Sequence, residues 1–381
     1  MRPPPGLPHP AGYVCLLRRA LYGLKQAPRA WFAKFSSSLI RLGFVASNYD
    51  SAMFIRKTVV GHIVVLYVDD MIVTGDDEDG IADFKQQLHS LFEIKDLGYL
   101  RYFLGIEVAY SPEGYILSQS KYISEVISRA GLTDDRIMDS PIELNHFLSA
   151  ADGELLSDVT RYREVVGSLV YLMVTRPDIT YVVHVVSQFA FAPRTTHWTA
   201  VLHILRYSRG TVHHGLLLSS TSDLVLTGYY DVDWAGDTTD QKSTTGYCIF
   251  LGNSLVAWKS KKQSVASRSS AEAEYQAMAT TAAKLIWFHR LLEELGFPQL
   301  SATPMFCDNQ SAIQIAKNPI FHECTKHIEI DCHFVQHHYL QGSLTLSHVS
   351  STSQLADVFT KSHTAPHFHH LISKLMVLAP S

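Results

Sequence analysis

Cysteine is scarce in this sequence, and long hydrophobic runs are absent. The five cysteines are odd in number, scattered and without a Cys-x-x-Cys pair, so we expect no disulfide framework and a reduced, intracellular chain. The most apolar stretch, residues 169–192, is interrupted by Arg176, Pro177 and Asp178, and residues 1–6 have no apolar core. We therefore expect no secretory signal and no membrane-spanning segment.

Acidic residues are nearly missing from one part of the chain. Between residues 13 and 57, eight lysines and arginines stand against a single acid, Asp50, although the whole chain has a formal charge of -4. This segment could present a phosphate-binding face to a nucleic acid. A solvated helix surface is the alternative interpretation for any one of these basic residues.

The length and the hydrophobic content predict a folded protein of two or three domains. The chain has 381 residues, of which 46% are hydrophobic, and this length exceeds what one core usually fills. Apolar periodicity and turn residues predict a helix over 28–42, a strand near 52–55, two strands around 67–70, a helix that ends at Leu91 and a hairpin over 103–117. A helix over 120–130 and a polar, turn-rich linker over 133–157 follow.

The pattern changes from helices to strands in the C-terminal part. A helical block is predicted over 160–209, and strands follow near 215–218, 224–231, 245–251 and 255–258. A long helix over 270–295, a strand over 304–307, a helix over 310–316 and an acidic turn at 355–357 complete the pattern. This order of elements indicates an α+β unit of about the size of one domain.

The string Tyr-Val-Asp-Asp at residues 67–70 stands between two apolar runs and predicts a tight acidic turn. Such a turn places the carboxylates of Asp69 and Asp70 at the tip of a hairpin. There they can bind the divalent cations that stabilise developing charge in phosphoryl transfer. A loop with two solvated aspartates is the alternative interpretation.

Several short strings, in a consistent order, resemble one known family over nearly the whole chain. The strings Leu-Tyr-Gly-Leu-Lys-Gln-Ala-Pro-Arg-Ala-Trp (21–31), Tyr-Val-Asp-Asp (67–70) and Tyr-Phe-Leu-Gly-Ile (102–106) resemble the reverse transcriptase of copia-type LTR retrotransposon Pol polyproteins. The strings at 233–237, 243–246, 271–275, 307–312, 325–328 and 354–357 resemble its ribonuclease H domain. The resemblance implies an α+β fold with three parts: a truncated reverse-transcriptase palm and thumb start over 1–140, a helical connection over 141–212, and a ribonuclease H-like mixed-sheet domain over 213–381.

For the reverse transcriptase, the resemblance implies that Asp69 and Asp70 are two of three polymerase carboxylates that bind Mg²⁺. The third belongs to an earlier palm strand that this sequence does not contain, and Met1 resembles an internal methionine of a longer protein. Polymerisation needs metals that act together on the primer hydroxyl and the triphosphate. We therefore expect no processive reverse transcription by this chain alone.

The turn and basic helix near residue 28 resemble the segment of the family that lies under the template. The candidates for nucleic-acid contact are Lys25, Gln26, Arg29 and Trp31. Trp31 could equally be a core residue, because it stands at helical spacing from Phe35.

For the ribonuclease H domain, the resemblance implies four catalytic carboxylates that hold two Mg²⁺ or Mn²⁺ ions: Asp231, Glu274, Asp308 and Asp357. Glu272 competes with Glu274, but two residues apart on a helix their side chains point about 200° from each other. Glu274 lies on the apolar stripe of the predicted helix, so we expect it to face the sheet. Asp233 shares a strand face with Asp231, and there the resemblance alone favours Asp231.

The implied function is metal-dependent endonucleolytic hydrolysis of RNA in RNA/DNA hybrids by a retrotransposon Pol fragment. The partner would be the hybrid, recognised mainly through its shape and backbone, together with other Pol segments. The implied compartment is a cytoplasmic particle or the nucleus. Two alternatives stay open: a noncatalytic nucleic-acid-binding remnant, and an assembly subunit of a longer Pol.

Overall fold

A computed structural model describes residues 3, 6–16, 23–67, 70–144, 148–237, 239–318 and 329–378. Contacts between residues divide the chain into two compact units, Met1–Leu97 and Gly98–Ser381, called unit 1 and unit 2 below. The domain boundaries at residues 140 and 212 stay a prediction, and strands over 114–118 and 215–219 pair with each other across both positions. In the described part of the chain, none of the helices combines the length and the apolar character that crossing a membrane requires.

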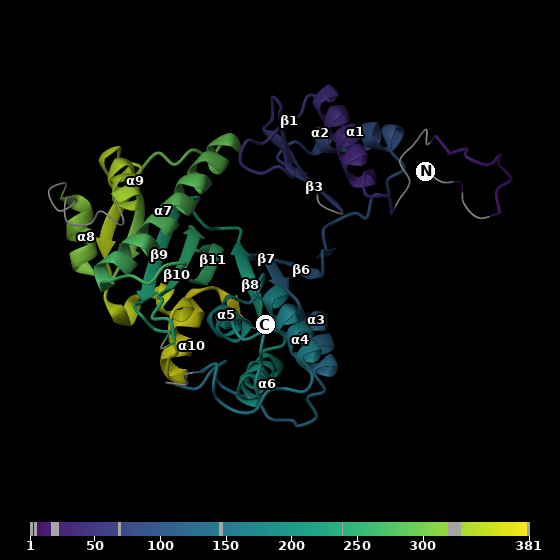
Figure 1. Cartoon of the computed structure of the whole chain (residues 1–381). Coiled ribbons are helices and arrows are strands. Elements are labelled where there is room, and N and C mark those ends of the chain that lie inside the picture. The colour runs from purple at the N-terminus through teal and green to yellow at the C-terminus, as the bar shows by residue number, and fades with distance from the viewer. Residues whose placement is uncertain are drawn as a thin grey trace. The chain divides into compact units, whose positions relative to one another are not determined.

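In its described residues, unit 1 has a four-stranded antiparallel sheet and two helices (Figure 1). Its elements are α1 (Ala27–Arg41), β1 (Val45–Ala46), β2 (Met53–Lys57), β3 (His62–Tyr67), β4 (Met71–Gly75) and α2 (Glu78–Leu91). The helix α2 begins at the predicted acidic run, where the Asp77 side chain accepts a hydrogen bond of 2.8 Å from the Gly80 N–H and caps the helix.

One hydrophobic core holds unit 1 together. Phe35 and Leu39 of α1 lie four residues apart, as do Phe84 and Leu88 of α2, and all four side chains are buried with Phe54 of the sheet. The strands β3 and β4 form the predicted hairpin. Within its turn, Val68 and Asp69 lie outside the described residues.

Unit 2 contains two sheets and most of the helices. Its first part comprises β5 (Tyr102–Phe103), β6 (Ile106–Ser111), β7 (Gly114–Ser118), α3 (Ser120–Arg129), α4 (Val159–Leu172), η1 (Pro177–Ile179), α5 (Thr180–Ser187), α6 (Thr195–Gly210) and β8 (Gly215–Ser219). The remaining elements are β9 (Leu226–Asp233), β10 (Thr244–Leu251), β11 (Ser254–Lys262), α7 (Ser270–Glu294), β12 (Thr303–Cys307), α8 (Gln310–Lys317), α9 (Glu329–Leu340), β13 (Leu344–His348), η4 (Ser351–Ser353), η5 (Leu355–Phe359), α10 (Ala365–Lys374) and β14 (Val377–Leu378).

The five-stranded mixed sheet of unit 2 has the order β11-β10-β9-β12-β13. The strands β9, β10 and β11 pair antiparallel, whereas β12 runs parallel to both β9 and β13. This arrangement confirms the predicted α+β class and its mixed sheet. The parallel contact brings the ends of β9 and β12 to the same edge of the sheet.

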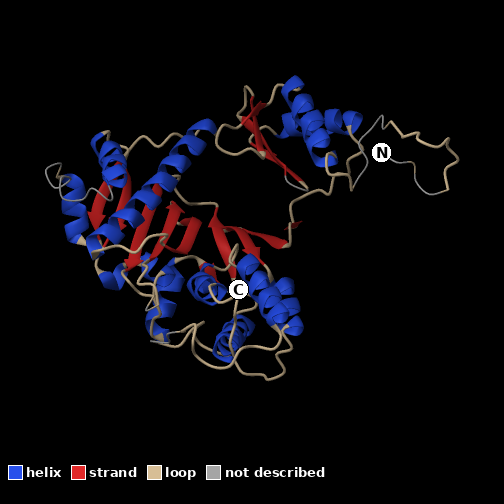
Figure 2. Ribbon diagram, in the orientation of Figure 1, coloured by secondary structure: helices blue, strands red, loops and turns tan. Residues whose placement is uncertain are grey.

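Both faces of the mixed sheet are covered, as Figure 2 shows. Successive residues of β10 alternate between two cores: Tyr247 and Ile249 belong to a core with α7, α8 and α9, and Cys248 and Phe250 belong to a core with α4, α5, α6 and α10. The long helix α7 lies along the sheet against β9 (Figure 1). A sheet covered on both faces explains why nearly all of β10 is buried.

The second sheet of unit 2 has the order β14-β8-β7-β6-β5. Here β8 pairs with β7, about a hundred residues earlier in the chain, with Leu216 opposite Leu117. On its other side β8 pairs with β14, with Leu216 opposite Val377. The segment around residues 102–118 and the chain after residue 213 therefore belong to one folded unit.

Candidate metal centre

The four carboxylates predicted for the ribonuclease H part come together at one edge of the mixed sheet. Asp231 belongs to β9, Glu274 to α7 and Asp357 to η5, and Asp308 directly follows β12. Asp231, Asp308 and Asp357 each offer an oxygen within 4.8 Å of the others, and Glu274, Cys307 and Asp308 form a second group of the same kind. Because Asp308 belongs to both groups, the two clusters are continuous.

Close approach of η5 to the sheet brings Asp357 beside Asp231. Opposite Asp231 in the register stands Gly246 of β10. A Cβ atom at Gly246 would lie 2.8 Å from the Phe359 Cβ, so only glycine leaves room for η5 at this distance. The buried Gln354 side chain donates a hydrogen bond of 3.0 Å to the Tyr230 carbonyl and accepts one from the Ala356 N–H. This amide fixes η5 to β9 next to the cluster.

Three polar neighbours contact the carboxylates directly. The Thr360 hydroxyl donates to Asp231 Oδ2, and the Ser351 hydroxyl donates to Asp308 Oδ2 at 2.8 Å. The Lys361 ammonium lies 3.0 Å from Asp357 Oδ2 and 3.5 Å from Asp231 Oδ2. The sequence pattern does not predict these three residues, although Lys361 stands four residues after Asp357, the spacing of side-chain neighbours on a helical turn.

Two of the carboxylates are held in an environment that disfavours their charge. Burial, followed by the charges of Asp231 and Asp308, raises the pKa of Glu274 to about 8. Burial and the Asp231 charge raise the pKa of Asp357 to about 8, against the opposing effect of Lys361. Asp357 Oδ1 is also buried and has no hydrogen-bond partner among the described residues.

This donor set fits a hard divalent cation. Carboxylate oxygens are the ligands that Mg²⁺ and Mn²⁺ prefer, and a cation would both bind the unpartnered Asp357 oxygen and offset the repulsion between the carboxylates. Cys307 does not change this preference, because burial raises the pKa of its thiol and keeps it protonated. Its Sγ lies 3.8 Å from Glu274 Oε2, the distance of a weak hydrogen bond.

The two rival acids lie outside the groups of converging ligand atoms. Glu272 is half-buried at the start of α7, where its carboxylate accepts a hydrogen bond of 2.7 Å from the Arg268 N–H and its own N–H bonds to the Ser269 hydroxyl. It therefore has a capping role. Asp233 is only partly buried at the end of β9, and its pKa is raised by burial and by Asp231.

The site residues predicted in unit 1 are not gathered around a buried centre. Asp70 is exposed after β3, and Asp69 lies outside the described residues. Lys25, Gln26 and Arg29 are exposed at the start of α1 and before it.

Trp31 of α1 belongs to an aromatic stack. Its ring lies 4.6 Å from the Tyr67 ring and 4.9 Å from the Phe35 ring, measured between centroids. The residue nevertheless remains 37% exposed. Trp31 thus packs on its neighbours and still presents a surface, so its contact with nucleic acid stays a prediction.

Known proteins resemble this chain over almost its whole length. Residues 1–144 match the family described as "Reverse transcriptase (RNA-dependent DNA polymerase)". The retrovirus-related Pol polyprotein from transposon RE1 of Arabidopsis thaliana is 42% identical over 368 residues, which are 96% of this chain and 25% of that protein. The putative transposon Ty5-1 protein of Saccharomyces cerevisiae is 34% identical over 281 residues, which are 72% of this chain and 91% of that protein. The chain belongs to the copia-type retrotransposon Pol family.

Family membership confirms the resemblance seen in the sequence strings. This Pol chain spans about a quarter of the length of the RE1 polyprotein, with 25% of it covered. Among solved structures, the foamy viral protease-reverse transcriptase in complex with RNA/DNA hybrid is 13% identical to this Pol chain, with 91% of this chain and 40% of that chain covered and a TM-score of 0.44. That likeness is too distant to carry an argument.

Proposed function

We propose that this Pol chain hydrolyses the RNA strand of RNA/DNA hybrids, using Mg²⁺ or Mn²⁺ held by Asp231, Glu274, Asp308 and Asp357. The observation that carries the proposal is the convergence of these carboxylates from separate segments of unit 2. Three of them, Asp231, Glu274 and Asp357, are at least 94% buried, with exposed fractions of 3%, 6% and 3%. Like charges are buried together in this way where a ligand compensates them.

The neighbours of the cluster hold its carboxylates in place. Thr360 donates to one oxygen of Asp231 and Ser351 to one oxygen of Asp308, which fixes the orientation of each carboxylate. Asp308 belongs to both groups of donors, so it would help to hold a cation in either group. When bound, two such ions activate a water molecule and stabilise the leaving 3′-oxygen.

The partner in this proposal is the hybrid duplex. Its A-like shape, phosphates and 2′-hydroxyls are the features that a protein reads without base sequence. Lys25, Gln26, Arg29 and Trp31 of unit 1 are the proposed further contacts, and other Pol segments are proposed partners. For the polymerase, the family resemblance assigns only Asp69 and Asp70 of its three carboxylates to these 381 residues, so we expect no processive reverse transcription by them alone.

Cleavage of a hybrid with labelled RNA tests the proposal. We expect Mg²⁺-dependent cleavage that EDTA abolishes and that Asp308→Asn lowers by on the order of 10²–10³-fold or more, because a shared ligand is lost. The matched control is Asp83→Asn, which changes an exposed acid of α2 in unit 1 and should leave cleavage unchanged. If the wild type and Asp308→Asn are equally inert while both are folded, the chain is not a ribonuclease H; retained hybrid binding would then favour the noncatalytic binding remnant.

A further inference from the structure

Lys361 holds a position that a divalent cation would take. Its ammonium lies between two carboxylates from different elements, 3.0 Å from Asp357 Oδ2 and 3.5 Å from Asp231 Oδ2. The same two residues belong to the group whose oxygens converge within 4.8 Å. A cation that binds these oxygens therefore competes with the ammonium for the same space and the same charge.

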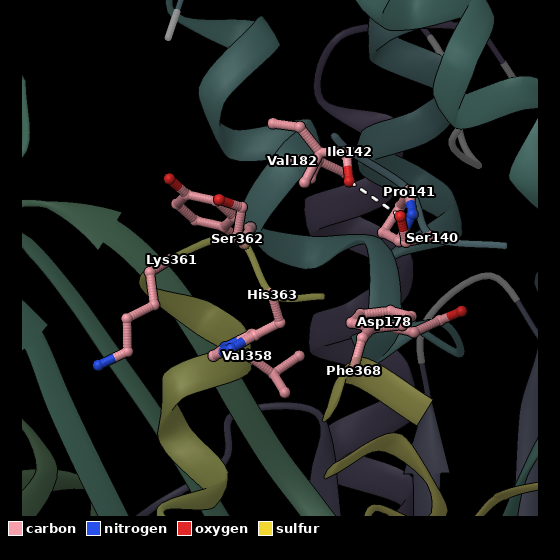
Figure 3. A pocket seen from close by; sticks show the side chains of 11 residues that line it. Ser140, Pro141, Ile142, Asp178, Val182, Val358, Lys361, Ser362, His363 and Phe368 are labelled. Carbon is pink, nitrogen blue, oxygen red and sulfur yellow. Dashed lines mark hydrogen bonds between the residues drawn. The ribbon is translucent and has the colours of Figure 1, made fainter. Parts of the chain in front are cut away.

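The lysine side chain is anchored at one end and free to move at the other. Its backbone N–H donates a hydrogen bond of 3.1 Å to the Asp357 carbonyl, so one turn of chain keeps it beside that residue. Its stem lines a small pocket with Val358 and His363, and its ammonium points away from the other labelled residues (Figure 3). Because the side chain is 42% exposed, the ammonium can rotate into solvent without unpacking the core.

The Lys361 ammonium alone does not neutralise the carboxylate cluster, which keeps an excess of negative charge. Asp231, Asp308 and Asp357 converge on one side and Glu274 approaches through Asp308, whereas Lys361 is the cation that contacts Asp231 and Asp357 within the described residues. The buried Asp357 Oδ1 also lacks a hydrogen-bond partner there. The lysine thus reduces the repulsion between the carboxylates but leaves a ligand atom open.

We propose that Lys361 is a placeholder for the divalent cation: its ammonium bridges Asp231 and Asp357 in the metal-free chain and is displaced when the cation binds. This inference rests on the proposed metal-dependent function and assigns Lys361 a positioning role. The placeholder role has two measurable consequences. The metal-free fold gains stability from Lys361, and the affinity for the cation is lower than the carboxylates alone would give.

Lysine labelling of the wild-type full chain tests the displacement directly. With acetic anhydride and peptide mass spectrometry, we expect Lys361 to be labelled slowly without metal and severalfold faster with saturating Mn²⁺. Lys262 is an internal control, because it bridges Asp237 and Asp240, which belong to neither converging group, and its labelling should not change. A Lys361 labelling rate that is the same with and without bound Mn²⁺ overturns the inference.

Substitution of Lys361 distinguishes displacement of its ammonium by the cation from simple charge repulsion between the two. Lys361→Met should bind Mn²⁺ about tenfold more tightly in calorimetry, equivalent to ~1.4 kcal/mol. It should melt at a lower temperature than the wild type without metal and at the same temperature with saturating Mn²⁺. Lys361→Arg retains the charge and should stay near the wild-type affinity, whereas Lys262→Met should lower the melting temperature equally with and without metal.

Two contrary results have different meanings. If Lys361→Met lowers the melting temperature by the same amount with and without bound Mn²⁺, the ammonium keeps its contacts beside the metal and the placeholder role is wrong. If the wild-type chain binds neither Mn²⁺ nor Mg²⁺, both the placeholder role and the proposed hydrolase function fail. Measured binding by the wild type therefore distinguishes failure of the inference alone from failure of the function.

Discussion

The two units of the chain differ in where they keep their charges. Among the described residues of unit 1, Ser38 is the one polar side chain that is buried, and the acidic turn ends in the exposed Asp70. The described residues of unit 2 include charged side chains that are buried in two places: the Arg176–Asp178 pair and the carboxylate cluster around Asp231. The described carboxylate of the acidic turn is thus exposed, whereas the cluster in unit 2 is assembled from distant segments and withdrawn from water.

The two buried sites within unit 2 differ in turn. Asp178 is paired with the Arg176 guanidinium at 2.6 Å and accepts a hydrogen bond of 2.7 Å from the Tyr207 hydroxyl, while Arg176 also donates to the carbonyl and hydroxyl of Thr211. The carboxylate cluster retains an unpartnered oxygen on Asp357. Burying a charge costs free energy unless partners compensate it. A fully compensated charge indicates a structural role, and a partly compensated cluster indicates a binding site.

The largest expected effect concerns the Arg176–Asp178 pair, which has the structural role in this comparison. Asp178→Asn leaves the Arg176 guanidinium buried without a counter-ion, so we expect a loss of about 3–5 kcal/mol in the free energy of unfolding of unit 2. Urea denaturation followed by circular dichroism measures this loss.

The matched control in unit 1 is Asp96→Asn. Its partner Lys85 lies 3.1 Å away, and the side chains of Lys85 and Asp96 are 42% and 58% exposed. This change should cost less than about 1 kcal/mol. Equal costs for both variants would remove the contrast between the units.

The local elements were largely predictable from the sequence. The helix predicted over 28–42 is α1, Ala27–Arg41, and the helix predicted over 270–295 is α7, Ser270–Glu294. The hairpin strands around the acidic turn are present as well. These elements follow from apolar periodicity, turn residues and caps, which act over a few residues. The pairing of β8 with β7 was not predictable, because nothing local in either strand specifies a partner a hundred residues away.

The candidate site was likewise predictable only in part. The family strings pointed to Asp231, Glu274, Asp308 and Asp357, and the structure places them together. The supporting contacts of Thr360, Ser351 and Lys361 escaped prediction, because single polar residues in turns carry no pattern. In the sequence, Arg176 and Asp178 indicate only an interruption of an apolar stretch. Their burial depends on Tyr207 and Thr211, about thirty residues further along the chain.

The second prediction concerns the pH dependence of the buried cluster. The pKa of Glu274 is raised to about 8 in the folded chain and is about 4.3 in an unfolded one. The folded state therefore binds the extra proton, and the stability that this provides is full below about pH 4 and is lost as the pH rises towards 8. Without metal, Glu274→Gln should be more stable than the wild type by about 2 kcal/mol at pH 8, and the difference should shrink at pH 5.

A change two residues away serves as the control. Glu272→Gln alters an acid of the same helix that lies outside the cluster, and it keeps an oxygen that can accept from the Arg268 N–H, so its stability should follow the wild type at both pH values. Adding Mn²⁺ at pH 8 should stabilise the wild type more than Glu274→Gln, because the variant has lost a charged ligand. Thermal melting measures all of these differences. An equal response of the two variants to pH would show that the Glu274 carboxyl is not held in the buried, repelling environment that sets the cluster apart from the acidic turn.

The smallest expected effect concerns the exposed charges of unit 1. Lys25 and Arg29 are exposed at and before the start of α1, in the region poor in acids, so their replacement should change nucleic-acid affinity rather than stability or chemistry. For the double variant Lys25→Ala, Arg29→Ala, we expect the slope of log Kobs against log salt concentration for hybrid binding to fall by about 1–2. Lys85→Ala, which removes a lysine already paired with Asp96, should leave the slope unchanged.

Because the carboxylates lie in unit 2, cleavage at saturating hybrid should be the same in the wild type, the double variant and Lys85→Ala. An unchanged slope would mean that these charges form a solvated surface, and a loss of cleavage at saturation would mean that unit 1 contributes to the chemistry as well as to binding.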